Sequence, residues 1–180
     1  MRPYYKNILL LSGTGRNVGK TSFVCTLLKH FSNQRFVTVK VSPHWHSARQ
    51  GAVILFEDKH VLLMREDNLD SHKDTSRMLR CGAAEVFYLQ HVGEEALMKA
   101  FRKMMSFGIE QQPLIIESAI LARHIKPALH LRITRSDVPP SDKPVIEMPF
   151  DKLVTFNGKN FDLAPGQLRW DNENFSWSLR

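Results

Sequence analysis

The chain has 180 residues, which is enough for one domain with a hydrophobic core, and its 43% hydrophobic content excludes a disordered or fibrous protein. No apolar run is long enough to cross a membrane and no basic, apolar leader precedes a cleavage site, so we expect a cytoplasmic protein without a membrane partner. The net charge of +7 favours anionic ligands such as nucleotide phosphates, although a solvated basic surface explains it equally well. Aromatic residues are not interleaved with the basic ones, which argues against nucleic acid.

An apolar strand, a glycine-rich turn and an amphipathic helix follow one another near the N-terminus. Residues 8–11 are apolar, and residues 12–22 read Ser-Gly-Thr-Gly-Arg-Asn-Val-Gly-Lys-Thr-Ser. Apolar residues then recur at helical spacing, at Phe23, Val24, Leu27, Leu28 and Phe31. This order predicts a phosphate-binding loop, because backbone N–H groups of such a turn and the N-terminal end of a helix attract phosphate oxygens. A glycine-rich turn that begins a helix and binds nothing is the plainer interpretation.

The residues expected to bind a nucleotide belong to this turn and to the start of the helix: Gly13, Thr14, Gly15, Arg16, Asn17, Val18, Gly19, Lys20, Thr21 and Ser22. Lys20 would neutralise the terminal phosphates, and the Thr21 hydroxyl would bind Mg²⁺ beside them. The usual pattern has glycine where this chain has Thr14. Gly13, one position earlier, makes the spacing to Gly19 one residue longer than usual.

Residues 35–41, rich in β-branched and aromatic side chains, predict a second strand that ends near Lys40. In a parallel sheet this lysine would lie near the phosphates and neutralise a bound or transferred anion. A solvated lysine at a strand end is the alternative. His44 and His46 follow in a loop, but they lack the further ligands of a zinc site, so we favour loop histidines near phosphate or at the surface.

The middle of the chain predicts a hairpin of residues 52–56 and 60–64, added at an edge of the sheet. A helix is expected to begin at Asp74 and to stop at Gly82. Asp74 and Arg77 either belong to a solvated face or project back to the nucleotide.

Residues 85–89 predict a further strand, and residues 94–107 a helix whose methionine-rich apolar stripe packs in the core. The short apolar strand of residues 113–118 then delivers Glu117 to the edge of the sheet. A carboxylate in this place is suited to Mg²⁺ or to its water shell, which we favour over a simple cap of the following turn.

Residues 128–133 predict another strand, and residues 134–137 (Thr-Arg-Ser-Asp) faintly resemble the element with which GTP-binding proteins read guanine. An ordinary turn before the prolines is favoured there. We expect one nucleotide-binding domain over residues 1–180, with residues 144–180 as a C-terminal hairpin and tail. Asn157-Gly158 predicts the turn of a hairpin over residues 153–163. The aromatic tail is expected to pack on the body or on a partner subunit.

Four segments together resemble the P-loop family that contains dethiobiotin synthetase and, more closely, the B protein of molybdopterin-guanine dinucleotide biosynthesis. They are residues 12–21, the strand ending in Lys40 with histidines just after it, residues 73–83, and residues 114–117. Ser118 departs from the pattern, because both relatives usually carry glycine there.

The resemblance implies the three-layer α/β fold of P-loop NTPases, a mostly parallel sheet with helices on both faces, here with added β-hairpins. It implies Mg²⁺-dependent binding and slow hydrolysis of ATP or GTP, an accessory role in cofactor biosynthesis and, in many members, a homodimer. Lys20, Lys40 and Glu117 would take the catalytic roles, and Thr21 and Glu117 would hold the metal.

Two other functions compete with this expectation. One is an ATP-dependent ligase or small-molecule kinase of the dethiobiotin synthetase type, in which Lys40 stabilises a carbamate or phosphorylated intermediate of an acceptor. The other is a nucleotide-gated interaction module whose aromatic tail docks a partner protein.

Overall fold

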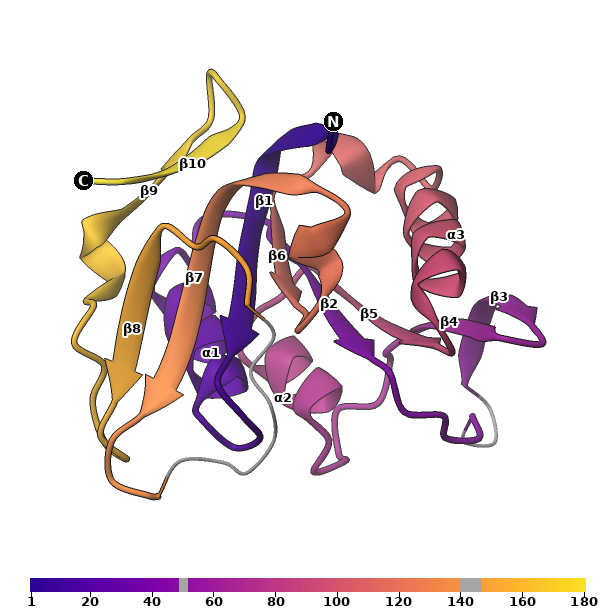
Figure 1. The fold of residues 1–180 in the computed structure, drawn as a ribbon, viewed down its shortest axis with the longest axis horizontal. Helices are drawn as coiled ribbons and strands as arrows, with labels where there is room; N and C mark the ends of the chain where they lie inside the picture. The colour runs from indigo at the N-terminus through magenta and orange to yellow at the C-terminus, as the bar shows by residue number, and fades with distance from the viewer. Residues whose placement is uncertain (49–51, 140–146) are drawn as a thin grey trace.

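The computed structural model describes residues 1–48, 52–139 and 147–180, and its central feature is one mixed β-sheet covered on both faces (Figure 1). The strands of the sheet are β1 (Tyr4–Gly13), β2 (Val37–Ser42), β3 (Val53–Asp58), β4 (Val61–Arg65), β5 (Glu85–His91), β6 (Leu114–Glu117), β7 (Lys126–Arg135) and β8 (Lys152–Phe156). Their order across the sheet is β3-β4-β5-β2-β6-β1-β7-β8.

The sheet is mostly parallel, as expected. All neighbours from β5 to β8 pair in parallel, whereas β4 is antiparallel to β5 and β3 is antiparallel to β4. Parallel strands are covered on both faces and therefore read as continuous apolar runs. The run Ile8–Leu11 in the middle of β1 is completely buried.

Among the described residues, three helices and a small second sheet cover the two faces. The helices are α1 (Lys20–His30), α2 (Asp74–Arg80) and α3 (Glu94–Met105), with short 3₁₀ turns η1 (Ile109–Gln111), η2 (Leu121–Arg123) and η3 (Pro165–Gln167). The second sheet is an antiparallel ribbon of β9 (Leu168–Asp171) and β10 (Ser176–Leu179).

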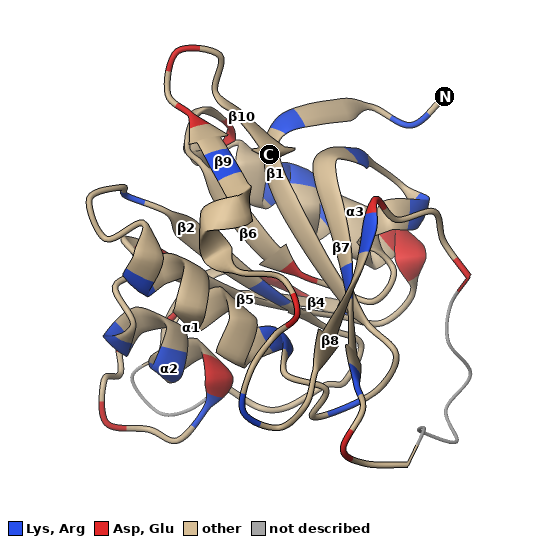
Figure 2. Cartoon of the chain, turned by 90° about the vertical axis from the view of Figure 1, so that its left-hand side faces the viewer, with Lys and Arg blue, Asp and Glu red and all other residues tan. Residues whose placement is uncertain are grey.

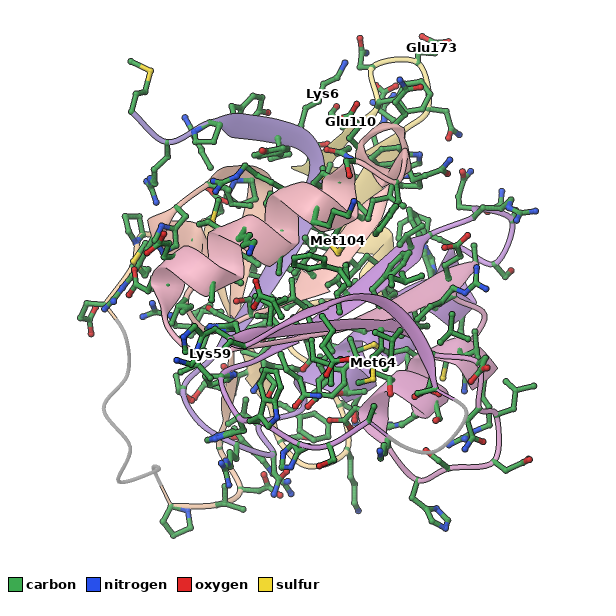
Figure 3. The ribbon with its side chains drawn as sticks, turned by 90° about the vertical axis from the view of Figure 1, so that its right-hand side faces the viewer. Lys6, Lys59, Met64, Met104, Glu110 and Glu173 are labelled. Atoms are coloured by element: carbon green, nitrogen blue, oxygen red, sulfur yellow. The ribbon has the colours of Figure 1, made fainter. Side chains whose placement is uncertain are left out.

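The two faces of the sheet carry separate apolar clusters. Leu9 and Leu11 of β1 point to the cluster formed with α1, α2 and the β9–β10 ribbon. Ile8 and Leu10 point to the cluster under α3, where Met104 lies fully buried against the sheet (Figure 3). Figure 2 shows α1 and α2 on their shared face, with lysine and arginine on both helices. The structure is thus an α/β fold with helices on both faces, and the methionine stripe belongs to its core.

The predicted edge hairpin and the predicted second helix are confirmed. Strands β3 and β4 form the hairpin at one edge of the sheet. Helix α2 begins at Asp74, and Gly82 follows its end with φ of 103°, a left-handed conformation that favours glycine.

The hairpin predicted for residues 153–163 is wrong in its second half. The turn at Asn157-Gly158 forms, but the returning segment makes only the single bridge from Phe161 to Phe156. Strand β8 instead pairs in parallel with β7 and forms an edge of the main sheet. Residues 144–146, where the C-terminal extension was expected to begin, lie outside the described residues.

The aromatic tail packs on the body of the protein. Trp170 and Trp177 of the ribbon are buried, and the ring of Trp177 stacks on Phe36 with centroids 5.0 Å apart. Among the described residues, no helix combines the length and the apolarity that crossing a membrane requires.

Candidate functional site

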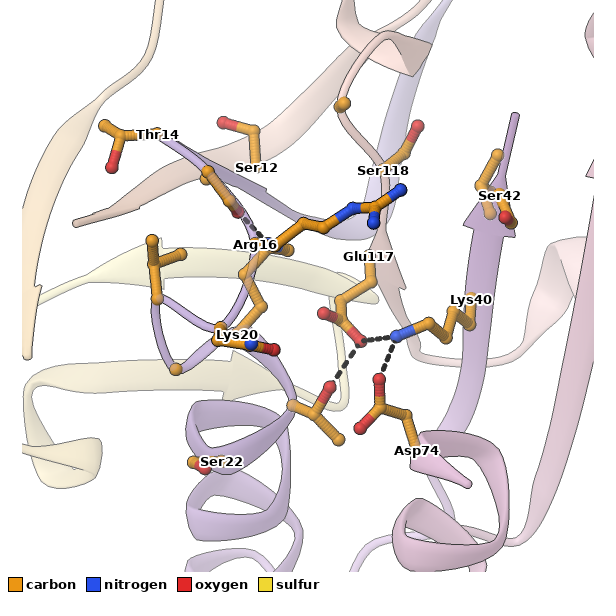
Figure 4. A pocket seen from close by; sticks show the side chains of 18 of the residues that line it. Ser12, Thr14, Arg16, Lys20, Ser22, Lys40, Ser42, Asp74, Glu117 and Ser118 are labelled. Atoms are coloured by element: carbon orange, nitrogen blue, oxygen red, sulfur yellow. Dashed lines mark hydrogen bonds and ion pairs between the residues drawn. The ribbon is translucent and has the colours of Figure 1, made fainter. Parts of the chain in front are cut away.

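The carboxyl ends of β1, β6 and β2 meet beside the turn that joins β1 to α1. The strand registers place Leu11 of β1 level with Glu117 of β6, and Glu117 level with Lys40 of β2. A cavity of about 710 Å³ opens at this edge of the sheet. Residues 13–19, which we call the glycine-rich loop, form one wall of it (Figure 4). We call this cavity the loop cavity.

The glycine-rich loop is wrapped closely around Lys20. A Cβ atom on Gly13 would lie only 2.8 Å from Nζ of Lys20 and 2.8 Å from a methyl carbon of Val18, so a side chain here would force one or both of these residues to move. Nζ of Lys20 donates a 2.9 Å hydrogen bond to the carbonyl oxygen of Gly15. Asn17 and Gly19 have φ values of 56° and 101°, which turn the loop sharply before α1 begins. All ten residues predicted for nucleotide binding line the loop cavity.

Glu117 lies on the floor of the loop cavity and links α1 to β2. The Thr21 hydroxyl donates a 3.0 Å hydrogen bond to Oε2 of Glu117, and Nζ of Lys40 lies 3.7 Å from the same oxygen. Lys40 also forms an ion pair with Asp74 at the start of α2 (Figure 4). The structure therefore brings together Lys20, Thr21, Lys40 and Glu117, as the sequence predicted.

The two lysines differ in their electrostatic surroundings. Burial lowers the pKa of Lys20, and the nearby cation of Lys40 lowers it further, although Glu117 opposes both effects. Burial also acts to lower the pKa of Lys40, but Glu117 and Asp74 together outweigh it, so this pKa is raised. Lys40 is thus held as a cation by its carboxylates, whereas Lys20 is the lysine that would gain most from an anionic ligand.

Arg16 reaches across the mouth of the loop cavity to the loop after β2. Its Nη2 lies 2.7 Å from Nε2 of His44. Because a guanidinium group has only donors, the ring nitrogen of His44 is the acceptor of this hydrogen bond. His46 lies outside the loop cavity, and no group of three potential metal-binding His, Cys, Asp or Glu side chains occurs in residues 1–48, 52–139 and 147–180.

Asp74 and Arg77 face the loop cavity, which decides a question that the sequence left open. Nη2 of Arg77 donates a 3.1 Å hydrogen bond to the Ser22 hydroxyl, so α2 and α1 are joined at the rim. A charged run of this kind is most often a solvated face, and composition alone did not choose between the two positions.

Several lining residues were missed by the sequence reasoning, among them Ser12, Arg132 and Phe156. Arg132 is buried near the end of β7 and stacks over the ring of Phe150 at 4.5 Å. His130, two residues earlier on the same strand, is also buried and lies with Nε2 2.9 Å from the Ser12 hydroxyl. Polar residues inside the apolar run 128–133 were a signal that could have found this cluster, because buried charged and polar groups need partners.

Ser118 has a local structural role in the turn that follows β6. Its hydroxyl accepts hydrogen bonds from the backbone N–H groups of Ile120 and Leu121, at 3.3 and 3.1 Å. The serine thereby caps the turn that follows β6, and its own N–H donates to the Leu11 carbonyl at 3.0 Å.

The Thr-Arg-Ser-Asp segment lies beside the glycine-rich loop. Arg135 donates two hydrogen bonds to the Asp137 carboxylate, at 2.6 and 2.8 Å, and a third to the carbonyl oxygen of Asn17 at 3.1 Å. The Asp137 carboxylate is therefore engaged by the arginine of its own segment.

With this geometry established, the chain was compared with known proteins. It matches no protein-family model, no curated protein and no solved structure.

Proposed function

We propose that the loop cavity binds a nucleoside triphosphate together with Mg²⁺, with the triphosphate held by the glycine-rich loop. One observation carries the proposal. The Thr21 hydroxyl and the Glu117 carboxylate, which are far apart in the sequence, touch at 3.0 Å directly beneath a loop that closes around Lys20. A hydroxyl and a carboxylate oxygen beside a lysine and a turn of backbone N–H groups suit a metal-bound polyphosphate.

The donor set fits Mg²⁺. This ion prefers oxygen ligands in octahedral geometry and is usually bound through one or two protein oxygens, with phosphate and water oxygens completing the shell. Thr21 and Glu117 supply two such oxygens, so a cluster of three protein ligands is not required. When bound, the ion would neutralise charge that develops on the phosphate oxygens.

The residues of the cavity would have different roles in hydrolysis. Attack of water on the γ-phosphorus forms a new P–O bond and breaks the bond to the bridging oxygen. The nucleoside diphosphate leaves with the electron pair, and the protons of the water leave with the inorganic phosphate. Lys20 would hold the transferred group, and the charged Lys40 would face it from β2. Glu117 is already engaged by Thr21 and Lys40, so its role would be to hold the metal and its waters, and turnover is expected to be slow.

The P-loop NTPase fold and an accessory role in cofactor biosynthesis form part of the proposal. They are supported by the sequence resemblance and by the place of Glu117 on β6, directly between β1 with its loop and β2 with Lys40. Docking of a partner through the aromatic tail has less support, because Trp170 and Trp177 are buried within the fold.

Transfer of the phosphoryl group to a small-molecule acceptor is a second candidate. The observation that favours it is a further cavity, which shares Lys40 and Asp74 with the loop cavity. An acceptor held there would lie beside the cation that faces the phosphates.

The test is a calorimetric titration of the full chain with ATP and with GTP in the presence of Mg²⁺. Lys20→Ala should weaken binding about 10- to 100-fold, the value of one or two charged hydrogen bonds. Lys29→Ala removes an exposed lysine of the same helix and should bind as the wild type does. Unchanged affinity in Lys20→Ala would overturn the assignment.

A further inference from the structure

Arg16 joins the glycine-rich loop to the loop that follows β2. It lies four residues before Lys20 in the chain, and its side chain is exposed at the mouth of the loop cavity. Nη2 of Arg16 lies 2.7 Å from Nε2 of His44, and both residues line this cavity. The steps proposed for hydrolysis make no use of this arginine, although it stands at the entrance to the site.

The contact between Arg16 and His44 passes over the end of β6. In the sheet, β6 lies between β1, which leads into the glycine-rich loop, and β2, which leads to His44. The three strands are parallel, so their carboxyl ends lie at one edge. A side chain that extends from the first loop to the second therefore crosses above Glu117, the last residue of β6 (Figure 4). The guanidinium group thus lies over the place proposed for the metal and the terminal phosphate.

The loop that carries His44 is fixed to the sheet. The backbone N–H of His44 donates a 3.2 Å hydrogen bond to the Ser42 hydroxyl. The backbone N–H of His46 donates to the side chain of Gln90, whose amide returns a 3.0 Å hydrogen bond to the His46 carbonyl. Gln90 is completely buried on β5. Arg16 therefore meets a partner whose position is set by the fold, and the protein itself holds the guanidinium group over the cavity.

Arg16 is a cation without a carboxylate partner in the part of the chain that the structure describes. The two carboxylates that line the loop cavity, Asp74 and Glu117, both lie beside Lys40. The acceptor that Arg16 has is a single imidazole nitrogen, and this contact is exposed to solvent. A phosphate group offers anionic oxygens that match the paired N–H donors of a guanidinium group, which makes it the stronger partner.

We propose that Arg16 recognises the terminal phosphate of the bound triphosphate and makes the site prefer triphosphates to diphosphates, a role that rests on the proposed function. Lys20 lies within the glycine-rich loop, hydrogen-bonded to the Gly15 carbonyl, and would contact the phosphates from there. Arg16 would contact the terminal phosphate from the mouth of the cavity, with two N–H groups on its oxygens. The hydrogen bond to His44 is then replaced by the contact with phosphate.

The test compares triphosphates with diphosphates by calorimetric titration of the full chain in the presence of Mg²⁺. The triphosphates are the imido analogues of ATP and GTP, in which an NH group between the β- and γ-phosphorus atoms prevents hydrolysis, and the diphosphates are ADP and GDP. The wild type should prefer the triphosphate. Arg16→Gln should reduce this preference about 10- to 100-fold, the value of one or two charged hydrogen bonds. Its affinity for the diphosphate should stay within about threefold of the wild type, because the contact is made to the terminal phosphate alone.

A matched variant separates this contact from a general loss of positive charge. Arg102→Gln removes an equal charge from an exposed position on α3 that does not line the loop cavity. It should keep the wild-type affinity for both nucleotides. Far-UV circular dichroism establishes that each variant is folded, which the exposed position of Arg16 favours.

The results distinguish failure of this role from failure of the proposed function. An undiminished preference for the triphosphate in Arg16→Gln, or an equal loss of affinity for triphosphate and diphosphate in that variant, would overturn the role of Arg16. Equal affinity of the wild type for the two nucleotides would do the same, and in each of these cases the proposed function stands. If the wild type binds neither nucleotide, the proposed function itself fails.

Discussion

The hydroxyl of Thr21 lies 3.0 Å from Oε2 of Glu117, so the first turn of α1 is tied directly to the end of β6. Both side chains are buried, and Lys40 approaches the same carboxylate oxygen. In this arrangement a bound metal would depend on the negative charge of the Glu117 carboxylate rather than on the shape of its side chain.

Glu117→Gln therefore separates metal binding from nucleotide binding. The amide keeps an oxygen that can accept from Thr21 but loses the negative charge, so the gain in nucleotide affinity on adding Mg²⁺ should shrink about tenfold. Titrations with and without Mg²⁺ measure this gain. Glu110→Gln, an exposed position in η1, should keep the full gain. An undiminished gain in Glu117→Gln would contradict the assigned role.

Gly13→Ala tests the close approach of the loop to Lys20. The new methyl group would lie 2.8 Å from Nζ of Lys20 and from Val18, so the lysine must move away and nucleotide affinity should fall about tenfold. Gly166→Ala is the matched control, because its nearest neighbour would be an ordinary 3.7 Å away. Equal affinities for the two variants, measured by calorimetry, would show that the loop has more room than its contacts indicate.

The stability of the protein should fall in mild acid because of His130. Burial lowers the pKa of this histidine below its usual 6.5, although its hydrogen bond to the Pro149 carbonyl opposes the shift. Above 6.5 the ring is neutral in both states. As the pH falls through 6.5 toward the lower native pKa, the unfolded chain takes up a proton that the native ring does not, which favours unfolding.

Urea denaturation at several values from about pH 7 to about pH 5 measures this dependence. His130→Gln should make the decline in the free energy of unfolding shallower. Part of the decline should remain, because burial also lowers the pKa of His91. His60→Gln, an exposed position in the hairpin turn, should follow the wild-type curve. If the free energy of unfolding of His130→Gln declined with falling pH as steeply as that of the wild type, the buried ring would be ruled out as a source of the acid sensitivity.

Trp177→Ala should destabilise the whole fold. The indole is 3% exposed and stacks on Phe36 of the main core, and deleting a buried tryptophan typically costs about 3–5 kcal/mol. Chemical denaturation should show this loss, while Trp45→Ala, at a position that is 42% exposed, should change stability by less than about 1 kcal/mol. If the two variants lost similar amounts of unfolding free energy, the β9–β10 ribbon would not belong to the cooperatively folding core.

The glycine-rich loop and its helix were predictable because their signals are local. The meeting of Thr21 with Glu117 was predictable only from a general rule, namely that the carboxyl ends of parallel strands share one edge of the sheet. Lys40 was placed correctly by the same rule. The order of the strands depends on pairings between distant segments, and no short pattern in the sequence encodes them.

The prediction for the second half of the C-terminal hairpin was wrong for a different reason. The Asn157-Gly158 turn was correct, but the path of the chain beyond a turn is decided by burial. Phe161 stacks on Phe156 with centroids 4.5 Å apart and also contacts Phe23 of α1, while Leu163 is completely buried. Burying these side chains against α1 stabilises the fold more than a second ladder of hydrogen bonds at the edge of the sheet would.

The packing of the β9–β10 ribbon also bears on how the protein matures during synthesis. Trp170 and Trp177 close the same apolar cluster that supports α1, the helix that follows the glycine-rich loop. A nascent chain that has not yet released this ribbon from the ribosome leaves that cluster open to water. The loop is translated before the ribbon, but it becomes firmly supported only after β9 and β10 have emerged.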